Sequence, residues 1–345
     1  MTRTQFRPQN HTNDSFLLTT VVGSHPQPDW YGELCTCHEQ GTLEEESLNE
    51  AADDLVKAVL ADYERAGLDV VTDGEVRRDG MVEHFTKFIH GYDVTDDDDS
   101  SDWNSHMPTA TDTVASDTPW LVDDYQFARN ASQQPVKITL PGPFTFASFC
   151  SLEAYDDMEE FIEDFTEVVR EEVSRLVDAG ARWIQLDEPA LGMSPHVEIA
   201  RDSIERISTA VPEDVRFGLH ICSGNYETLA PAIFSFPVDE IDLEFASDDA
   251  DSIESVLGGV DLEVDVSVGV VDSQDTTVES VSEIEQRIRH ALEVVPPERL
   301  TLTPDCGLKP LPRDVAFAKV ANLASAARSI EADLDANRLD VAIAD

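Results

Sequence analysis

The chain has 345 residues, a length that allows either one large barrel or two ordinary domains. Its 71 acidic and 23 basic residues give a formal net charge of −48, and a surface of that sign repels phosphate, which excludes nucleic acids and anionic membranes as partners. Hydrophobic residues still make up 41% of the chain and the acidic residues follow amphipathic patterns, so we expect a folded protein with a solvated acidic shell. Because concentrated salt screens the repulsion between such charges, we predict a halophilic protein in a salt-rich cytoplasm.

The cysteines are odd in number, irregularly spaced and not preceded by a signal peptide, which argues against a disulfide framework. We therefore expect reduced thiols and a cytoplasmic protein. No apolar run approaches the length needed to cross a bilayer. The cysteines are Cys35, Cys37, Cys150, Cys222 and Cys306.

Residues 1–15 are polar and are expected to form a loose arm, after which strand and helix patterns alternate along the chain. The strand patterns are short runs of apolar and β-branched residues at Phe16–Val22, Leu68–Thr72, Val136–Leu140, Trp183–Leu186, Val215–Ile221, Glu240–Glu244, Leu262–Val270 and Leu300–Thr303. The helix patterns lie at Glu44–Ala66, Met158–Ala179, Ile199–Ala210, Tyr226–Ile233, Asp251–Leu257, Ser280–Val294 and Arg313–Ile330.

The stretch from Gly91 to Trp120 interrupts this rhythm. It contains the run Asp96–Asp99 and many Ser and Thr residues, so we expect an extended acidic surface loop. A calcium site is the alternative, but the run lacks the alternating ligand spacing of a calcium-binding loop.

Strict alternation of strand and helix predicts a parallel sheet, and eight units predict its closure into a (β/α)8 TIM barrel, with the acidic insertion loop after the second strand. We expect residues 16–335 to form this single catalytic barrel. An independent feature supports it, because polar residues collect at the C-terminal ends of the predicted strands, where such barrels keep their active sites. These residues are Ser24, Glu75, Asp187, His220, Glu244 and Cys306.

His220 and Cys222 end one strand two residues apart, so their side chains point to the same face and can bind one metal ion. Alone, such a pair is more often a packed histidine beside an inert thiol. Glu244 and Cys306 at two later strand ends complete a plausible Zn2+ ligand set, and so thiolate-rich a set suits activation of a sulfur nucleophile. We expect Glu244 to leave the metal when a substrate thiol arrives. A rival group, Cys35-x-Cys37-His38, falls in the predicted first connecting loop and lacks a matching second pair.

Other strand ends could hold an amino acid. Glu75 and Asp187 can pair with an ammonium group, whereas the turn at Val22, Gly23 and Ser24 can offer N–H groups and a hydroxyl to a carboxylate. Each also has a structural explanation, since Asp187 could cap a helix, the turn could simply be a turn, and Glu75 could pair with a nearby arginine.

The chain resembles the cobalamin-independent methionine synthase family, in particular its C-terminal catalytic barrel. The resemblance implies a barrel in which His220, Cys222, Glu244 and Cys306 bind catalytic zinc and in which Val22, Gly23, Ser24, Glu75 and Asp187 hold L-homocysteine. Full-length members carry a second, N-terminal barrel that this chain lacks, so it is similar to the compact single-barrel members. The matching phrases are Thr19–Ser24, Asp73–Glu75, Met81–Glu83, Phe85, Gly142–Thr145, Gln185–Ala190, His220–Cys222, Leu243–Glu244, Ser247 and Pro304–Lys309.

The methyl donor is where the chain departs from the family. The family's folate-contacting tryptophan falls on Phe149, its glutamate near Met193, and its proton-donating histidine on Gln274, while its arginine-containing loop has no counterpart around Asn104–Pro108. A methyl group leaving tetrahydrofolate requires a general acid, whereas one leaving cobalamin does not.

We therefore predict methylcobalamin or a methyl-corrinoid protein as the donor in a zinc-dependent methionine synthase. The alternatives are a methyltetrahydrofolate-type or related pterin donor with Asp272 as the acid, a corrinoid-linked methyltransferase acting on another small thiol, and a non-catalytic subunit that binds zinc and homocysteine.

Overall fold

The computed structural model of the chain describes residues 17–93, 107–192, 197–247, 252–260 and 262–344. The predicted arm at 1–15 and the acidic run Asp96–Asp99 lie outside these residues. The chain separates into two compact units. One comprises Arg77–Gln126 and Ile138–Ile241, and the other comprises Phe127–Lys137, Asp242–Asp345 and the described part of Arg7–Val76.

The first unit is built on three parallel strands whose residues are all buried, as expected of a parallel sheet covered on both faces. β4 (Ile138–Pro141) pairs with β5 (Trp183–Asp187), and β5 pairs with β6 (Arg216–Ile221). This register sets Asp187 directly opposite His220. The helices of this unit are α3 (Glu83–Thr86), α5 (Pro143–Ser148), α6 (Met158–Asp178), α7 (Pro189–Gly192), α8 (Val197–Ser208) and α9 (Tyr226–Ile233).

α6 has the two-sided character that its sequence predicts. Asp157 caps its N-terminus by accepting a hydrogen bond from the Glu160 N–H. Its apolar stripe, which includes Phe161, Phe165 and Val169, is buried, whereas most of the glutamates on its other side are exposed.

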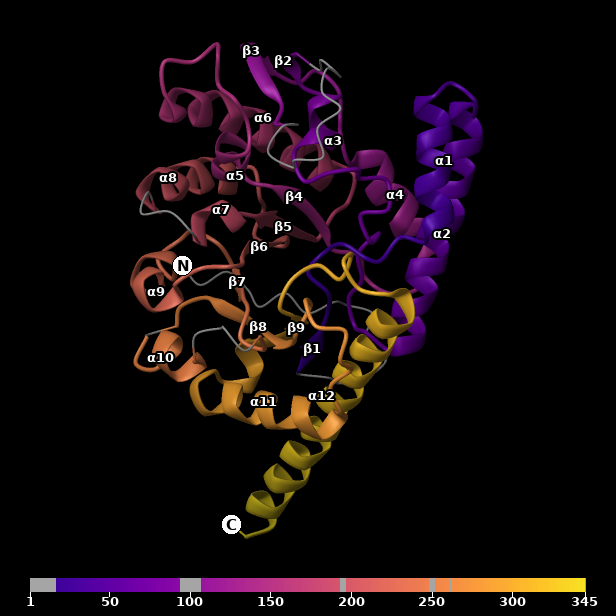
Figure 1. Ribbon diagram of the computed structural model, residues 1–345. Coiled ribbons are helices and arrows are strands. Elements are labelled where there is room, and N and C mark those ends of the chain that lie inside the picture. Colours follow the sequence, from indigo (N-terminus) through magenta and orange to yellow (C-terminus); the bar gives the residue numbers. More distant parts are fainter. Residues whose placement is uncertain (1–16, 94–106, 193–196, 248–251, 261, 345) are drawn as a thin grey trace. The chain divides into compact units, whose positions relative to one another are not determined.

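The second unit contains the parallel strands β1 (Leu18–Thr19), β8 (Asp265–Val271) and β9 (Leu300–Pro304), and β9 pairs with both of the others. Its longest helix, α12 (Arg313–Ala344), packs against α2 (Glu45–Ala66) and α11 (Val281–Val294) (Figure 1). α2 ends at Gly67, whose φ of 89° is the left-handed conformation that favours glycine, and α11 begins with a capping box between Ser280 and Glu283. The unit also contains α1 (Asp29–Glu39), α10 (Ile253–Leu257) and the 3₁₀ helix η1 (Pro297–Arg299).

The predicted strand Leu68–Thr72 has the expected place but forms only one isolated bridge, Val71 with Val136. The Asp69 and Val70 N–H groups donate to the Thr19 carbonyl, and the Val71 N–H donates to the Pro135 carbonyl. The Asp69 carboxylate accepts the Thr19 N–H at 2.9 Å. The Asp69 side chain thus accepts the Thr19 N–H, which in a continuous pair of strands would donate to a backbone carbonyl.

The main sheet has the strand order β1-β9-β8-β7-β6-β5-β4, with β7 at Glu240–Leu243. Residues 69–71 lie between β1 and Pro135–Lys137, the segment that leads into β4. Strand and helix therefore alternate around a curled parallel sheet, and the predicted TIM-barrel class is confirmed.

The interpretation of Gly91–Trp120 as an extended loop is wrong for the described part of that stretch. β2 (His90–Asp93) and β3 (Thr109–Ala115) form an antiparallel hairpin, in which Ala110 and Val114 are buried. The Thr residues of β3, which we interpreted as loop-forming, are β-branched and suit an exposed strand face. The acidic insertion itself is not tested, because residues 94–106 lie outside the described part of the chain.

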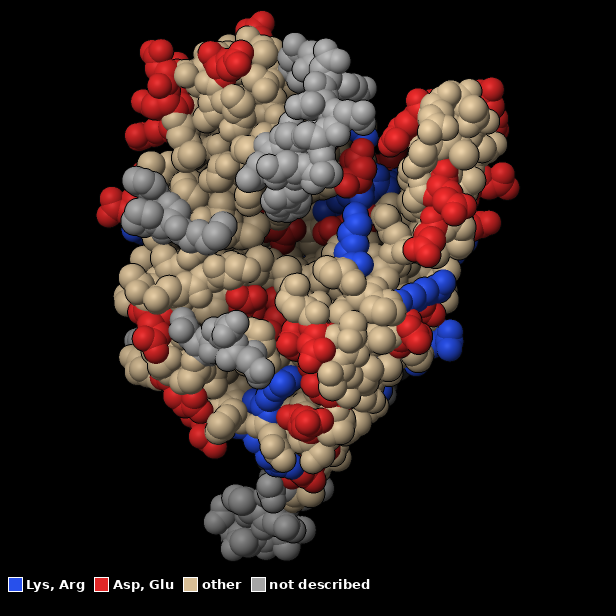
Figure 2. All heavy atoms as spheres, in the orientation of Figure 1, with Lys and Arg blue, Asp and Glu red and all other residues tan. Residues whose placement is uncertain are grey.

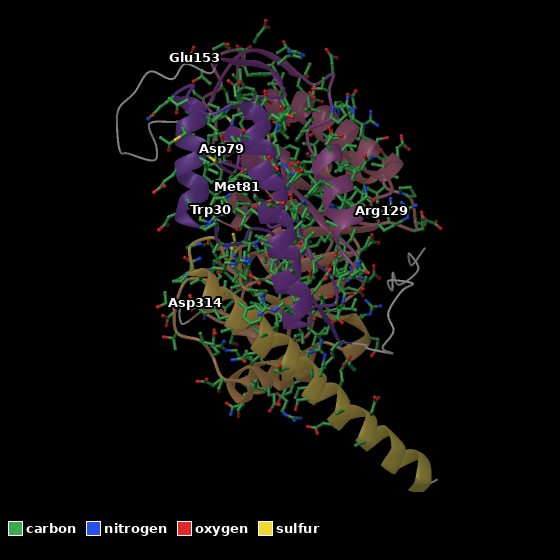
Figure 3. The ribbon with its side chains drawn as sticks, turned by 90° about the vertical axis from the view of Figure 1, so that its right-hand side faces the viewer. Trp30, Asp79, Met81, Arg129, Glu153 and Asp314 are labelled. Carbon is green, nitrogen blue, oxygen red and sulfur yellow. The ribbon has the colours of Figure 1, made fainter. Side chains whose placement is uncertain are left out.

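The interpretation of Cys35–His38 as part of a connecting loop is also wrong, because these residues lie on α1. Only Tyr31 of this helix is buried, and Trp30 is 47% exposed. Figure 3 labels Trp30 on this helix. The helix therefore lacks the apolar stripe that would have predicted it. A second helix, α4 (Val122–Ala131), was likewise not predicted.

On the face drawn in Figure 2, acidic side chains lie at many places rather than in one patch. Figure 2 shows Asp and Glu across the visible face, with fewer Lys and Arg among them. Such a distribution fits a solvated acidic shell.

Among the described helices, none combines the length and apolar character that a membrane crossing requires.

Candidate functional site: a thiolate and imidazole cluster at the strand ends

His220 and Cys222 lie at the C-terminal end of β6 and are only 2% and 8% exposed. The Glu188 N–H donates to the His220 carbonyl at 2.8 Å, and the Tyr226 hydroxyl donates to the Ile221 carbonyl at 2.9 Å. These bonds hold the backbone on both sides of the metal-ligand pair. Ser223 follows with a φ of 58°, a strained value for a residue other than glycine and one that turns the chain sharply after Cys222.

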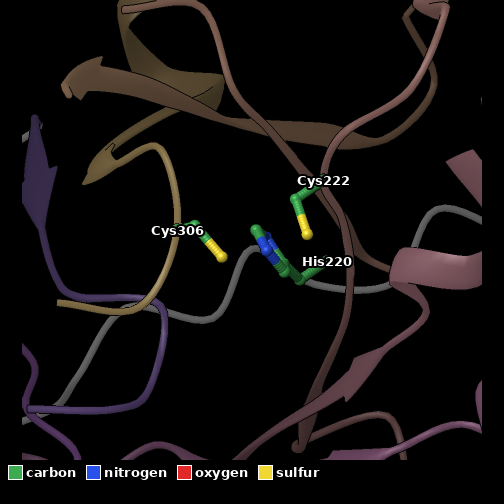
Figure 4. A group of neighbouring side chains, drawn as sticks. All are labelled: His220, Cys222 and Cys306. Carbon is green, nitrogen blue, oxygen red and sulfur yellow. The ribbon is translucent and has the colours of Figure 1, made fainter. Parts of the chain in front are cut away.

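Three of the four predicted ligands come together. His220, Cys222 and Cys306 each offer one ligand atom, and these atoms lie within 4.8 Å of one another (Figure 4). Two sulfurs and an imidazole nitrogen are donors that suit Zn2+, and the predicted set is completed by a carboxylate. The donor chemistry therefore fits zinc.

Glu244, the fourth predicted ligand, is not a member of that close group and lies half-buried just after β7. The loop that carries it is held by Asp305, the neighbour of Cys306. The Asp305 carboxylate accepts the N–H groups of Phe245, Ala246 and Ser247 at 2.8–3.2 Å. Burial raises the pKa of Asp305 to about 7, an effect that the backbone hydrogen bonds oppose and the nearby Glu244 carboxylate reinforces. Sequence reasoning missed this role of Asp305.

The predicted carboxylate-binding turn lies beside the loop that carries Cys306. The Leu308 N–H donates to the Ser24 carbonyl at 2.9 Å, and the Thr72 hydroxyl donates to the Gly23 carbonyl at 2.7 Å. A Cβ on Gly307 would lie 2.1 Å from the Ser24 hydroxyl oxygen, so a side chain at 307 would displace this hydroxyl. Val22, the first residue of this turn, is buried.

Glu75 follows a tight turn in which the Asp73 carboxylate accepts the Glu75 N–H at 3.0 Å. Its φ of 54° is unusual for a residue other than glycine, and such strain is often found at functional sites. The alternative of a surface pair between Glu75 and Arg77 or Arg78 stays a prediction. Arg77 lies 3.4 Å from Asp124, and Arg78 donates to Thr139.

Asp187 is 8% exposed at the end of β5 and accepts a hydrogen bond from Gln185 at 2.7 Å. Its neighbour Glu188 is fully buried and accepts the Phe144 and Thr145 N–H groups. Burial raises the pKa of Glu188 to about 7. Sequence reasoning assigned no role to Glu188, because its partners lie more than 40 residues away.

Asp272, the predicted proton donor for a folate-type substrate, begins the turn after β8. Its carboxylate accepts the N–H groups of Gln274 and Asp275 at 2.7 and 3.2 Å, so it has a structural role in this turn. Gln274 is exposed and Phe149 half-buried, while Met193 lies outside the described residues. The catalytic role of Asp272 stays a prediction.

The rival Cys35–Cys37–His38 group forms no potential metal cluster within the described residues. Its histidine ring lies 3.1 Å from the Leu43 carbonyl, a local contact that closes the end of α1. All five cysteines are free thiols. A second potential metal group does exist on the surface, at Glu254, His290 and Glu293, and all three residues are exposed.

Comparison with known proteins identifies the family. Residues 17–329 match the family model described as cobalamin-independent synthase, catalytic domain. The chain belongs to this family. It is 36% identical to a methionine synthase of Sulfolobus acidocaldarius over 90% of this chain and 91% of the relative, and 34% identical to one of Pyrococcus furiosus over 92% and 94%.

Solved structures agree on the fold. A B12-independent methionine synthase from Shewanella sp. W3-18-1 in complex with selenomethionine superposes with a TM-score of 0.78 at 25% identity, over 93% of this chain and 99% of that one. A putative vitamin-B12-independent methionine synthase from Listeria monocytogenes gives a TM-score of 0.75 at 22% identity, over 90% and 96%. The predicted family, and the prediction that the chain is an enzyme of that family, are confirmed.

The prediction of a methylcobalamin or methyl-corrinoid donor is not supported, because the family is cobalamin-independent. The prediction failed because departures from the family's residues at Phe149, near Met193, at Gln274 and around Asn104–Pro108 were taken to exclude a folate donor. The comparisons also give no support for a halophilic protein.

Proposed function

We propose that this chain is a methionine synthase, which transfers a methyl group from a methyltetrahydrofolate-type donor to the thiol of L-homocysteine. The observation that carries the proposal is the close cluster of His220, Cys222 and Cys306 at strand ends of a barrel of this family. We propose that these residues and Glu244 hold Zn2+. Bound zinc would keep a substrate thiol deprotonated near neutral pH, whereas a free thiol with a pKa of about 8.5 is mostly protonated there.

The remaining strand-end residues have the chemistry to orient the amino acid. We propose that Glu75 and Asp187 pair with the ammonium group and that the Val22, Gly23 and Ser24 turn receives the carboxylate. Burial of Asp187 strengthens such a pair, since a charge-assisted hydrogen bond gains strength where water is excluded. Glu244 lies outside the close cluster, so we propose it as the ligand that would be displaced if a substrate thiol bound the zinc.

A methyl group that leaves a tetrahydrofolate needs a proton delivered to the departing amine. We propose Asp272 as the acid, either directly or through a water, because its turn follows the C-terminal end of β8. We also propose a cytoplasmic location, in keeping with five free thiols.

The test is transfer of isotope-labelled methyl to homocysteine by the purified protein, with methyltetrahydrofolate and methylcobalamin supplied separately. Assays at low and at molar KCl guard against loss of fold at low ionic strength. We expect labelled methionine with the folate donor and none with methylcobalamin. Turnover with methylcobalamin alone would refute the donor assignment, and no transfer from either donor by zinc-loaded protein would refute the proposed function.

A further inference from the structure

Asp305 connects the loop that carries Glu244 to the loop that carries Cys306. Its side chain is 2% exposed, and its two oxygens accept hydrogen bonds from three successive backbone N–H groups. Oδ1 accepts from Phe245 at 3.0 Å and Ala246 at 2.9 Å, while Oδ2 accepts from Ser247 at 2.8 Å. Successive N–H groups that converge on one carboxylate form an anion-binding concavity, so the backbone just after Glu244 is held around this one side chain.

Asp305 is itself fixed from the neighbouring strand. Its N–H donates to the Val271 carbonyl at the end of β8, at 2.8 Å. On the same strand, a Cβ added to Gly269 would lie 2.2 Å from Asp305 Oδ1 and 3.1 Å from the Glu244 Cα. The absence of a side chain at 269 thus leaves the space in which the carboxylate meets the loop.

We propose that Asp305 is a positioning residue for the metal site, and that its carboxylate sets the direction of Glu244 with respect to Cys306. The inference rests on the proposed function, because it takes these two residues as zinc ligands. The physical reason is that Glu244 cannot rotate with its loop unless Phe245, Ala246 and Ser247 give up their shared acceptor. Residues that orient metal ligands in this way typically change metal affinity by about 10–100-fold when they are replaced.

Asp305→Asn is the first test, since the amide keeps the shape but replaces one acceptor oxygen by a donor that faces N–H groups. Glu172→Gln is the matched control. Glu172 is also fully buried and accepts two successive backbone N–H groups, from Trp120 at 3.0 Å and Leu121 at 2.8 Å, but it holds no loop with a predicted ligand. A general loss of stability would affect both variants alike, whereas a positioning role affects Asp305 alone.

Gly269→Ala is a second variant that leaves the Asp305 carboxylate chemically intact. Its methyl group would lie 2.2 Å from Asp305 Oδ1, 2.9 Å from the Asp305 Cα and 3.1 Å from the Glu244 Cα, so the carboxylate and the loop after Glu244 must shift apart. This variant decides the question if Asp305→Asn fails to fold. All proteins should carry His290→Ala, which removes a donor from the exposed Glu254, His290 and Glu293 group and prevents surface binding from obscuring the titration.

The measurements are the zinc dissociation constant, by competition with a chelator of known affinity, and hydrogen exchange of the 245–247 amides in the metal-free protein. We expect Asp305→Asn and Gly269→Ala to weaken zinc binding about 10–100-fold and to speed exchange of these amides, with Glu172→Gln within about threefold of the parent. The parent is the protein that carries His290→Ala alone. If Asp305→Asn or Gly269→Ala folds and binds zinc as tightly as the parent, the positioning role is overturned. It is also overturned if Glu172→Gln loses as much zinc affinity as these variants. If the parent itself binds no zinc, it is the proposed function that fails.

Discussion

Lys319 provides a stringent test of how this acidic protein is stabilised. It is 0% exposed on α12, and its ammonium nitrogen lies 2.7 Å from a carboxylate oxygen of Glu279. The other Glu279 oxygen accepts the Asp272 N–H at 2.8 Å and lies 3.3 Å from Arg287. Asn322 of α12 donates to the Glu279 carbonyl at 2.7 Å. The pair therefore joins α12 to the segment that fixes the turn after β8.

Replacement of Lys319 by Met leaves the buried Glu279 carboxylate with Arg287 as its remaining cation, and Arg287 is 34% exposed. Loss of one partner of a buried pair costs about 3–5 kcal/mol of unfolding free energy, and we expect the lower value because Arg287 remains. The double change with Glu279→Gln removes the isolated charge and should recover most of this loss. Lys57→Met is the control, since the Lys57–Asp54 pair is 54% and 72% exposed and should contribute less than about 1 kcal/mol.

The assay is urea-induced unfolding at 0.2 M and 2 M KCl. Salt screens exposed pairs far more than buried ones, so the cost of Lys319→Met should persist at 2 M KCl. A cost below about 1 kcal/mol, or one that salt abolishes, would show that this pair does not stabilise the fold in the way described.

Three further predictions concern pH, substrate binding and salt. Burial holds the pKa of His25 at about 4, below its ordinary 6.5, so the stability gained with a neutral His25 is present above pH 6.5 and is lost as pH falls toward 4. Across this window the wild-type protein should lose up to about 3 kcal/mol more unfolding free energy than His25→Leu. Equal pH profiles of the two proteins would contradict the assignment. Asp187→Asn should weaken homocysteine binding by about 1.5–3 kcal/mol in calorimetric titration with no change in zinc content, and unchanged affinity would leave Asp187 a structural role only. With a net charge of −48, the protein should have a higher thermal midpoint in molar KCl than at low salt, and the reverse order would contradict the screening argument.

The parts of the fold that the sequence predicted are those encoded by local patterns. The helices α2, α6 and α11 were predicted to within one residue of their bounds, because signals such as the apolar stripe of α6 and Gly67 after α2 depend on residues within one or two turns. The strand ends at His220 and Cys306 were placed to within a residue or two because buried apolar runs stop there. The family resemblance added the roles that local pattern alone left open.

What the sequence did not predict depends on partners distant along the chain or on weak periodicity. Asp305 and Glu172 were not recognised as anchors because their N–H donors lie about 50–60 residues away. The hairpin strand Thr109–Ala115 buries only two side chains, and α1 buries only Tyr31, so neither shows a strong pattern. The donor prediction failed for a different reason, since it inferred the methyl donor from a small set of departures from the family's residues, Gln274 and Phe149 among them.

Zinc content and methyl transfer measured together in wild type and Cys306→Ser test the central claim most directly. The protein should bind one zinc per chain at His220, Cys222, Glu244 and Cys306, and it should methylate homocysteine. Cys306→Ser should lose both properties while keeping its circular dichroism spectrum, because the barrel core does not depend on the ion. A folded Cys306→Ser protein that retains full zinc and normal transfer would contradict the account.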